Sequence, residues 1–492
     1  MATETAPPRA SPTPQALATR VGVVVAALAF LVLTSVLAAS DRIVLPAAVL
    51  LSSVALAVAA VTAWRSFALF VCGVIVVRPL LDLTAGPRAA GLSPTDVFGG
   101  AVLLVSLAWL LLNRAEALHR LRLRLAFAVV AMAGVMLLSA LAAPHLTSAL
   151  QLVLRVITGA VLFLVVDLLL HRGLLTARVL VTALAAAYVV PLLYPLLALV
   201  GVTVRHEKDG VEALKSVFFL SNNYGHFLVP LVAVAAAWVA HVRGRSRIAA
   251  LVVVGVAGIE LLATQTRGAW VATVVAVLCV GVLLNRRLVL ATAAVTVLVA
   301  LYVPAVNARL TSLEQDADQP RTESSLVWRF GHWEELLPRA TESPLLGLGP
   351  DESVLLTGKE PHNDYVRALV ETALLGIATY LWFLAALGAV AVRAVRVVGG
   401  TPLRASPRIR VPPRVYDRAT QATVVGLGGS MAGAMVASLG ENLIDNVTFL
   451  SILMPCAALL VHAAEGRWSW AWTSPDRPEV APAPAPPRAS GP

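Results

Sequence analysis

Long apolar runs separated by short polar loops make up most of this chain. From residue 21 to residue 464 the runs recur, and at roughly 18 residues or more each can cross about 30 Å of hydrocarbon as a helix. The runs predict helices at 21–39, 43–63, 66–84, 96–112, 125–143, 150–170, 177–201, 224–241, 248–264, 269–285, 288–305, 366–392, 419–438 and 447–464. The sequence therefore predicts an all-α polytopic membrane protein with about 12 to 14, most simply about 14, transmembrane helices.

The composition agrees with this fold class and excludes a soluble one. Hydrophobic residues make up 58% of the 492 residues and charged residues only 13%, against about 25% charged in soluble domains. The net charge of +10 could suggest a nucleic-acid partner, but the basic residues lie between apolar runs without interleaved aromatic residues. We therefore expect them to report membrane orientation, with no nucleic acid bound.

The arginine clusters predict which loops face the cytoplasm. With a cytoplasmic N-terminus, every arginine cluster in a short loop falls on the inner side, as the positive-inside rule requires. The region between residues 393 and 418 alone holds seven arginines. Both termini are then expected in the cytoplasm.

One long loop is expected outside the membrane. It carries eleven acidic and five basic residues, and Ser325–Leu337 within it has the pattern of an amphipathic helix. The predicted regions are a disordered cytoplasmic tail at 1–18, helices one to eleven within 19–305, the large extracytoplasmic loop with short helices at 306–364, the last three helices at 365–466 with the basic cytoplasmic loop 393–418, and a disordered Pro/Ala-rich cytoplasmic tail at 467–492.

Charged and polar residues at the outer ends of the helices are candidates for function, because such groups are costly in a membrane. They are Arg78, Asp82, Arg155, Arg205, His206, Asn222, Asn223, Glu260, Arg267, Arg329, His332, His362, Arg367, Glu371, Glu441 and Asp445.

Several of these have a structural alternative. Arg78 with Asp82, and Arg367 with Glu371, are spaced i and i+4, so each pair could neutralise itself. Arg155 could extend to the lipid headgroups. Asn222 and Asn223 could cap a helix, and Glu441 and Asp445 could form a solvated face.

Two segments favour function more strongly. Arg267 is a lone cation on the predicted outer side, and Gly268 after it allows close backbone approach. His362 follows Pro361 at the water boundary, where an imidazole can act as a general base near neutral pH. The residues after it, Asn363 above all, could equally serve as a helix cap.

The residue types suggest phosphate chemistry. The sequence shows no Gly-rich phosphate loop, Ser-His-Asp order or metal-binding spacing, and we expect no cofactor and no metal. Guanidinium groups bind phosphate oxygens bidentately and keep their charge. Arginines and one histidine therefore suit transfer of a group from a lipid pyrophosphate to an acceptor hydroxyl outside the membrane.

Three strings together carry a family resemblance: Thr266-Arg267-Gly268-Ala269, then Trp328-Arg329 through Trp333 with Pro344 to Pro350, then Pro361-His362-Asn363-Asp364-Tyr365 with Leu369, Glu371 and Gly376. In this order, around one large outer loop, they resemble the O-antigen ligase and O-antigen polymerase superfamily of bacterial envelope enzymes.

The resemblance implies a metal-independent glycosyltransferase in the bacterial plasma membrane, with an undecaprenyl-pyrophosphate-linked saccharide as donor and a glycan or lipid as acceptor. Arg267 and Arg329 would hold the pyrophosphate, and His362 would activate the acceptor hydroxyl. Further possible substrate-binding residues are Arg205, His206, Asn223, His332, Asn363, Tyr365, Arg78 and Glu371. Ligase and polymerase activity share the donor, so the sequence leaves both open.

Two other functions are compatible with a polar outer surface. A transporter or flippase of lipid-linked sugars would place its contacts near the bilayer midplane and would show an internal repeat, and we see no repeat. A non-catalytic envelope assembly protein would use the large loop as a docking surface.

Overall fold

The computed structural model describes residues 66–84, 94–208, 211–308, 326–399 and 416–468. The predicted helices at 21–39 and 43–63, the two tails and most of the loop at 393–418 lie wholly or largely outside these ranges.

Helices make up nearly all of the described chain. In order they are α3 (Phe67–Val77), the 3-10 helix η1 (Arg78–Thr84), α4 (Pro94–Leu112), α5 (Arg114–Arg120), α6 (Arg124–Leu141), α7 (Leu146–His171), α8 (Ala177–Leu193), the 3-10 helix η2 (Tyr194–Val200), α9 (Ser221–His241), α10 (Arg245–Ala263), α11 (Arg267–Leu284), α12 (Arg286–Tyr302), α14 (Leu326–Leu336), the 3-10 helix η3 (Leu337–Thr341), α15 (Glu352–Thr357), α16 (Asp364–Val398), α17 (Arg418–Ala437) and α18 (Val447–Ala464).

The prediction of an all-α polytopic membrane protein is confirmed, but within the described residues fewer helices meet the length and hydropathy of a membrane span than predicted there. Eight of the described helices are long and apolar enough to cross a membrane, or nine if α4 and α5, which meet at 95°, form one broken span. The predicted span at 66–84 is only an 11-residue α-helix, α3, followed by η1. The predicted span at 288–305 is α12, with 17 residues.

Helix α17 corresponds to the helix predicted at 419–438, and much of it is buried in the bundle. It packs against α9 and α11, and its glycines allow the backbones to approach closely. A Cβ atom on Gly426 would lie 2.5 Å from the Cα atom of Val234, and one on Gly433 would lie 2.8 Å from the carbonyl oxygen of Ala272. Small residues at such contacts are typical of helix packing in membranes.

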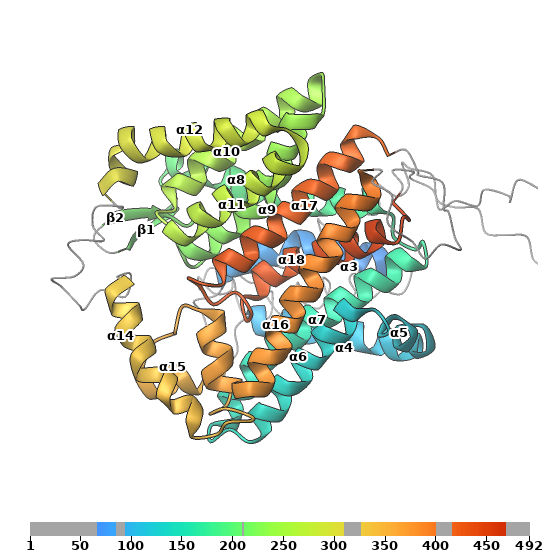
Figure 1. The fold of residues 1–492 in the computed structure, drawn as a ribbon, viewed down its shortest axis with the longest axis vertical. Coiled ribbons are helices and arrows are strands. Elements are labelled where there is room, and N and C mark those ends of the chain that lie inside the picture. Colours follow the sequence, from blue (N-terminus) through green and yellow to red (C-terminus); the bar gives the residue numbers. More distant parts are fainter. Residues whose placement is uncertain (1–65, 85–93, 209–210, 309–325, 400–415, 469–492) are drawn as a thin grey trace, which may run out of the picture.

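The elements outside the bundle lie at two opposite sides (Figure 1). The short strands β1 (Arg205–Lys208) and β2 (Val211–Leu214) lie with α14 and α15 on the left, whereas α5 lies on the right. The strands form an antiparallel hairpin in which Arg205 pairs with Leu214, an element that the all-α prediction did not include.

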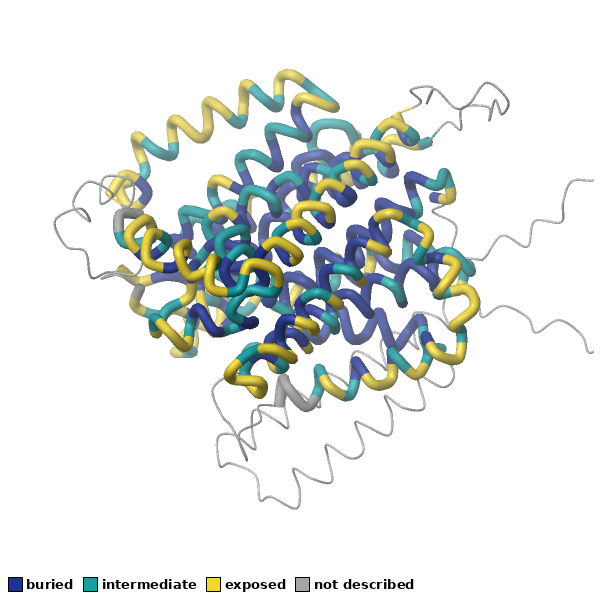
Figure 2. Tube along the Cα trace, turned by 60° about the horizontal axis from the view of Figure 1, so that its bottom comes forward, coloured by how far each residue is buried: buried dark blue, intermediate teal, exposed yellow. Residues whose placement is uncertain are grey.

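Burial follows the expected pattern for a helical bundle. Figure 2 shows buried residues concentrated in the interior and exposed residues along the outer helices. Helix α12 has no buried residue, and apolar side chains such as Leu290 and Tyr302 are largely exposed on it. In a membrane protein an apolar exposed face of this kind contacts lipid.

Candidate functional site

The site is built around the first part of α16, which is interrupted at Ala373. This residue has φ 46° and ψ −144°, outside the helical range, so nearby backbone groups lose their helical partners. Leu348 N donates to Val370 O at 3.1 Å, Gly349 N donates to Glu371 O at 2.9 Å, and Leu374 N donates to the carbonyl of Pro344 at 3.2 Å. The Pro344–Pro350 segment therefore fills the break.

Gly347 makes this insertion possible. Its φ is +74°, and a Cβ atom there would lie 2.4 Å from the backbone carbon of Glu371. Only glycine allows both this conformation and this approach. The segment thus fixes where Asp364–Thr372, the outer part of α16, lies.

A loop formed by residues 438–446, between α17 and α18, gathers the candidate residues. Asn363 N donates to Asn442 Oδ1 at 3.1 Å. The Asp364 carboxylate accepts hydrogen bonds from Leu443 N at 3.1 Å and Ile444 N at 3.3 Å. The 438–446 loop is therefore fastened to the start of α16, directly after His362.

Glu441 of this loop is the meeting point of two predicted site residues. Its carboxylate lies 3.5 Å from His362 Nδ1 and 4.0 Å from Arg329 NH2. It also accepts a hydrogen bond from Asn222 Nδ2 at 2.8 Å. Side chains from α9, α14 and the segment before α16 thus converge on the carboxylate of Glu441 in the 438–446 loop.

The charge of Glu441 is stabilised by these neighbours. Burial by itself would raise its pKa, but the hydrogen bond and charge of His362, followed by the charges of His226 and Arg329, outweigh burial and hold the pKa at about 2. A carboxylate that stays ionised beside an imidazole can orient the ring and stabilise its protonated form.

Arg267 begins α11 next to this cluster. Its neighbour Thr266 donates from Oγ1 to Asn222 Oδ1 at 3.2 Å, and Asn222 contacts Glu441. On its other side, a Cβ atom on Gly268 would lie 3.6 Å from the ring of His226. Thr266 and Asn222 therefore link the start of α11 to Glu441, which Arg329 and His362 also contact.

Helix α14 covers the cluster from the large loop. Arg329 NH1 donates to Gly440 O at 2.6 Å, and Trp333 Nε1 donates to Pro361 O at 2.8 Å. His332 is buried and stacks on Trp328 with ring centroids 4.7 Å apart. One short helix thus contacts both the segment before His362 and the 438–446 loop.

His362 itself is held in an uncommon backbone conformation. Its φ is 49°, in the left-handed region that costs energy for a residue with a Cβ atom. Asn363 after it caps α16, and its Oδ1 accepts from Tyr365 N at 2.9 Å and Val366 N at 3.1 Å. Asn363 therefore acts as the cap that the sequence allowed.

A second, buried ion cluster lies behind the first. Arg367 is 3% exposed, and its guanidinium lies 3.1 Å from Glu371, 3.2 Å from Asp445 and 3.5 Å from Asp351. Asp445 also lies 3.7 Å from the half-exposed Arg155. This cluster holds the far end of the 438–446 loop against α16.

The remaining candidates lie in local contacts. Arg78 pairs with Asp82 at 2.7 Å. Arg205 is more than half exposed and pairs with Glu212 on the adjacent strand at 3.3 Å, and His206 lies on the same hairpin. Asn223 contacts the 438–446 loop, because its Oδ1 accepts a hydrogen bond from Asn446 Nδ2 at 3.1 Å. Tyr365 contacts α17, where its hydroxyl donates to Met435 O at 3.1 Å.

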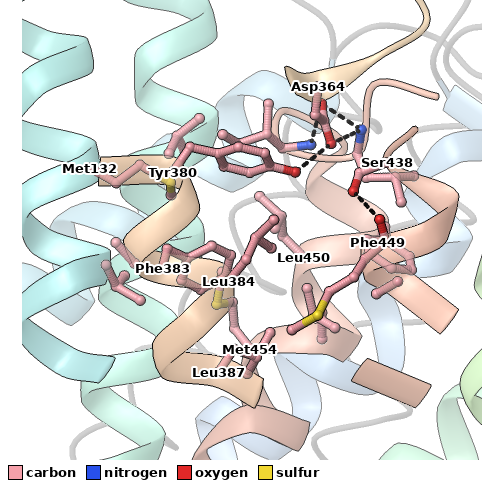
Figure 3. A pocket seen from close by; sticks show the side chains of 18 residues that line it. Met132, Asp364, Tyr380, Phe383, Leu384, Leu387, Ser438, Phe449, Leu450 and Met454 are labelled. Atoms are coloured by element: carbon pink, nitrogen blue, oxygen red, sulfur yellow. Dashed lines mark hydrogen bonds between the residues drawn. The ribbon is translucent and has the colours of Figure 1, made fainter. Parts of the chain in front are cut away.

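An apolar cavity lies below Asp364 (Figure 3). Asp364, Tyr380 and Ser438 form its polar end, and Leu387 and Met454 line the opposite end. Its volume of about 30 Å³ corresponds to about two water molecules. The lipid chain of a donor would therefore have to lie outside this cavity.

Sequence reasoning undervalued the 438–446 loop. For Glu441 and Asp445 the sequence leaves a solvated face open beside a functional role, and nothing in the local pattern indicates a partner. In the structure their side chains are only 12% and 11% exposed, and Arg329 and His362 lie beside Glu441 while Arg367 lies beside Asp445. Within the described ranges, no group of three or more His, Cys, Asp or Glu residues could hold a metal ion.

One comparison with known proteins matches part of the chain. Residues 252–381 match the family model Wzy_C, described as O-antigen ligase. The matched range contains Arg267, Arg329 and His362 and ends before the 438–446 loop. A comparison with curated proteins finds no match. The predicted family resemblance is thus confirmed over residues 252–381.

Proposed function

We propose that this multi-pass membrane protein, which carries an O-antigen ligase domain, transfers a saccharide from a polyprenyl pyrophosphate donor to an acceptor hydroxyl. The observation that carries the proposal is the convergence of Arg329 and His362 on Glu441, beside the start of α11 with Arg267. We further propose that this cluster faces the outer side of the plasma membrane and that both termini are cytoplasmic.

The proton and the leaving group have separate places in this arrangement. The Nδ1 side of His362 faces Glu441, so Nε2 is the nitrogen that takes the proton from the acceptor hydroxyl. The hydroxyl oxygen then bonds to the anomeric carbon of the donor sugar, and the bond from that carbon to the phosphate oxygen breaks. The polyprenyl pyrophosphate leaves with the bonding electrons.

Three charged groups stabilise this step. Glu441 stabilises the imidazolium that forms on His362 and orients the ring, as the carboxylate does in a catalytic triad. Arg267 and Arg329 supply positive charge for the pyrophosphate as negative charge develops on it. Because guanidinium groups supply that charge, we propose that transfer needs no metal ion, and a rate unchanged by EDTA is the expected result.

A reconstituted transfer assay tests the proposal. Purified protein, undecaprenyl-pyrophosphate-linked oligosaccharide and an envelope glycan acceptor are combined, and the product is measured by mass spectrometry. Arg267→Ala and His362→Ala should abolish product while the melting temperature in detergent stays within a few degrees. The matched controls are Arg339→Ala, an exposed arginine paired with Glu342, and His119→Ala, an exposed histidine.

The outcome separates the functions. Wild-type transfer by both Arg267→Ala and His362→Ala would refute the assigned site. Movement of intact lipid-linked saccharide across a liposome bilayer without any glycosidic product would instead indicate a flippase. Comparing the glycans of a deletion strain distinguishes the two enzymes, since unlinked polymer indicates a ligase and single unpolymerised repeats indicate a polymerase.

A further inference from the structure

Two buried nitrogen atoms on α14 have no hydrogen-bond partner within the described part of the chain. They are Nε of Arg329 and Nε2 of His332. The two residues are spaced i and i+3, so their side chains share one face of the helix. His332 is only 6% exposed, and an unsatisfied polar atom at such a depth is costly unless a ligand completes its bonding.

The surroundings of His332 determine its protonation state. Burial is the main cause that lowers the pKa of His332, and the charges of His362 and Lys359 lower it further. The charge of Glu335 and a hydrogen bond with the Lys359 backbone raise this pKa, but burial outweighs them. The ring is therefore neutral at pH 7. A backbone carbonyl takes the single proton of a neutral imidazole, and the nitrogen without a partner then presents a lone pair. Nε2 is thus an acceptor.

We propose that Arg329 Nε and His332 Nε2 together bind one hydroxyl group of a saccharide. A hydroxyl oxygen accepts the hydrogen bond of the Nε–H group and donates its own hydrogen to the imidazole lone pair, so one group satisfies both atoms. A phosphate oxygen only accepts, and it would face the lone pair of His332 unfavourably. The pair therefore selects sugar hydroxyl over phosphate.

The position of the pair agrees with this role. Trp333, next to His332 on α14, donates to Pro361 O, directly before His362, and a positive charge on His362 lowers the pKa of His332. The inference rests on the proposed function, because it places the hydroxyl beside the general base. Both the donor sugar and the acceptor saccharide must reach His362, so the hydroxyl can belong to either.

The test uses His332→Phe in the full-length protein, because a phenyl ring can still stack on Trp328. The probes are undecaprenyl pyrophosphate without a sugar and the same lipid carrying one N-acetylglucosamine, with dissociation constants measured by microscale thermophoresis in detergent. The transfer assay gives KM for the acceptor. His332→Gln keeps an acceptor oxygen and should recover most of any loss. The control is His241→Phe, because His241 lies beside Gln421 at the end of α9 opposite to Asn222.

The size of one lost hydrogen bond sets the expected effect at about 3- to 10-fold. Weaker binding of the sugar-bearing lipid alone assigns the hydroxyl to the donor, and a raised KM for the acceptor alone assigns it to the acceptor. Equal weakening of both lipids, or no change in any constant, would overturn the proposal.

The inference and the proposed function fail in different ways. If Arg267→Ala and His362→Ala are inactive while His332→Phe behaves as wild type, only the hydroxyl site is wrong. If those two variants keep full transfer, the proposed function is wrong whatever His332→Phe does.

Discussion

Replacing Glu441 by glutamine removes the charge at the centre of the site with little change in shape. A glutamine side-chain oxygen can still accept the hydrogen bond of Asn222, which is 2.8 Å from the carboxylate in the native protein. The substitution therefore isolates the charge that Glu441 presents to His362 and Arg329.

The structure sets the magnitude of this change. The pKa of Glu441 is lowered from 4.5 to about 2, which corresponds to about 3 kcal/mol favouring the carboxylate in the folded protein. Two unit charges 3.5 Å apart interact by about 5 kcal/mol at an effective dielectric constant of about 20. Since only part of a charge has formed on His362 in the transition state, we expect a loss of about 2–3 kcal/mol, or about 30- to 150-fold in kcat/KM.

Two measurements check the prediction. The first is kcat/KM of Glu441→Gln in the transfer assay, with Glu212→Gln as the control because Glu212 is 75% exposed on the hairpin. The second is the melting temperature against pH. Because the folded pKa lies below the unfolded value, the stabilisation is complete above about pH 4.5 and is lost as the pH falls towards 2. The variant should lack this acid-dependent loss.

One result would refute the reasoning. A Glu441→Gln protein with kcat/KM within twofold of wild type would show that the carboxylate neither orients His362 nor stabilises its charged form. The role of His362 would then have to be explained without the 438–446 loop.

Two further substitutions test how the site is held in place. Gly347→Ala should destabilise the protein by more than about 2 kcal/mol. The reason is that φ at this position is +74° and that the new Cβ atom would clash with the Glu371 backbone. Gly331→Ala on α14, where nothing lies within 4 Å, should be neutral or slightly stabilising, and equal melting temperatures for the two would contradict the packing described. Arg367→Met should lower the free energy of unfolding by about 3–5 kcal/mol, because it leaves three carboxylates without their shared buried cation. An unchanged melting temperature of this variant would count against that cluster.

The helices that cross the membrane could be located from the sequence because their formation is a local matter. In hydrocarbon every backbone group must be paired within its own segment, so a long apolar run is enough to predict a helix. Residues 146–171 and 447–464 illustrate this agreement closely. Within the described residues, the overcount of spans arises where an apolar run forms a helix of fewer than 18 residues, as at α3 and α12.

The break in α16 could not be predicted in the same way. Ala373 is neither glycine nor proline, and its neighbours favour a helix. The break depends on the Pro344–Gly349 backbone, which pairs with the freed groups from more than twenty residues earlier in the chain. A local pattern contains no information about such a partner.

The sequence by itself determined that this is a helical membrane protein whose residues 252–381 resemble O-antigen ligases, and its motifs singled out Arg267, Arg329 and His362. Only the tertiary structure decided that Arg329 and His362 meet, and that Glu441 stands between them. The physical reason is distance along the chain, because Glu441 lies far beyond His362 in sequence. The charge of Glu441 is stabilised by groups that surround it only after folding, and those groups come from three separate parts of the chain.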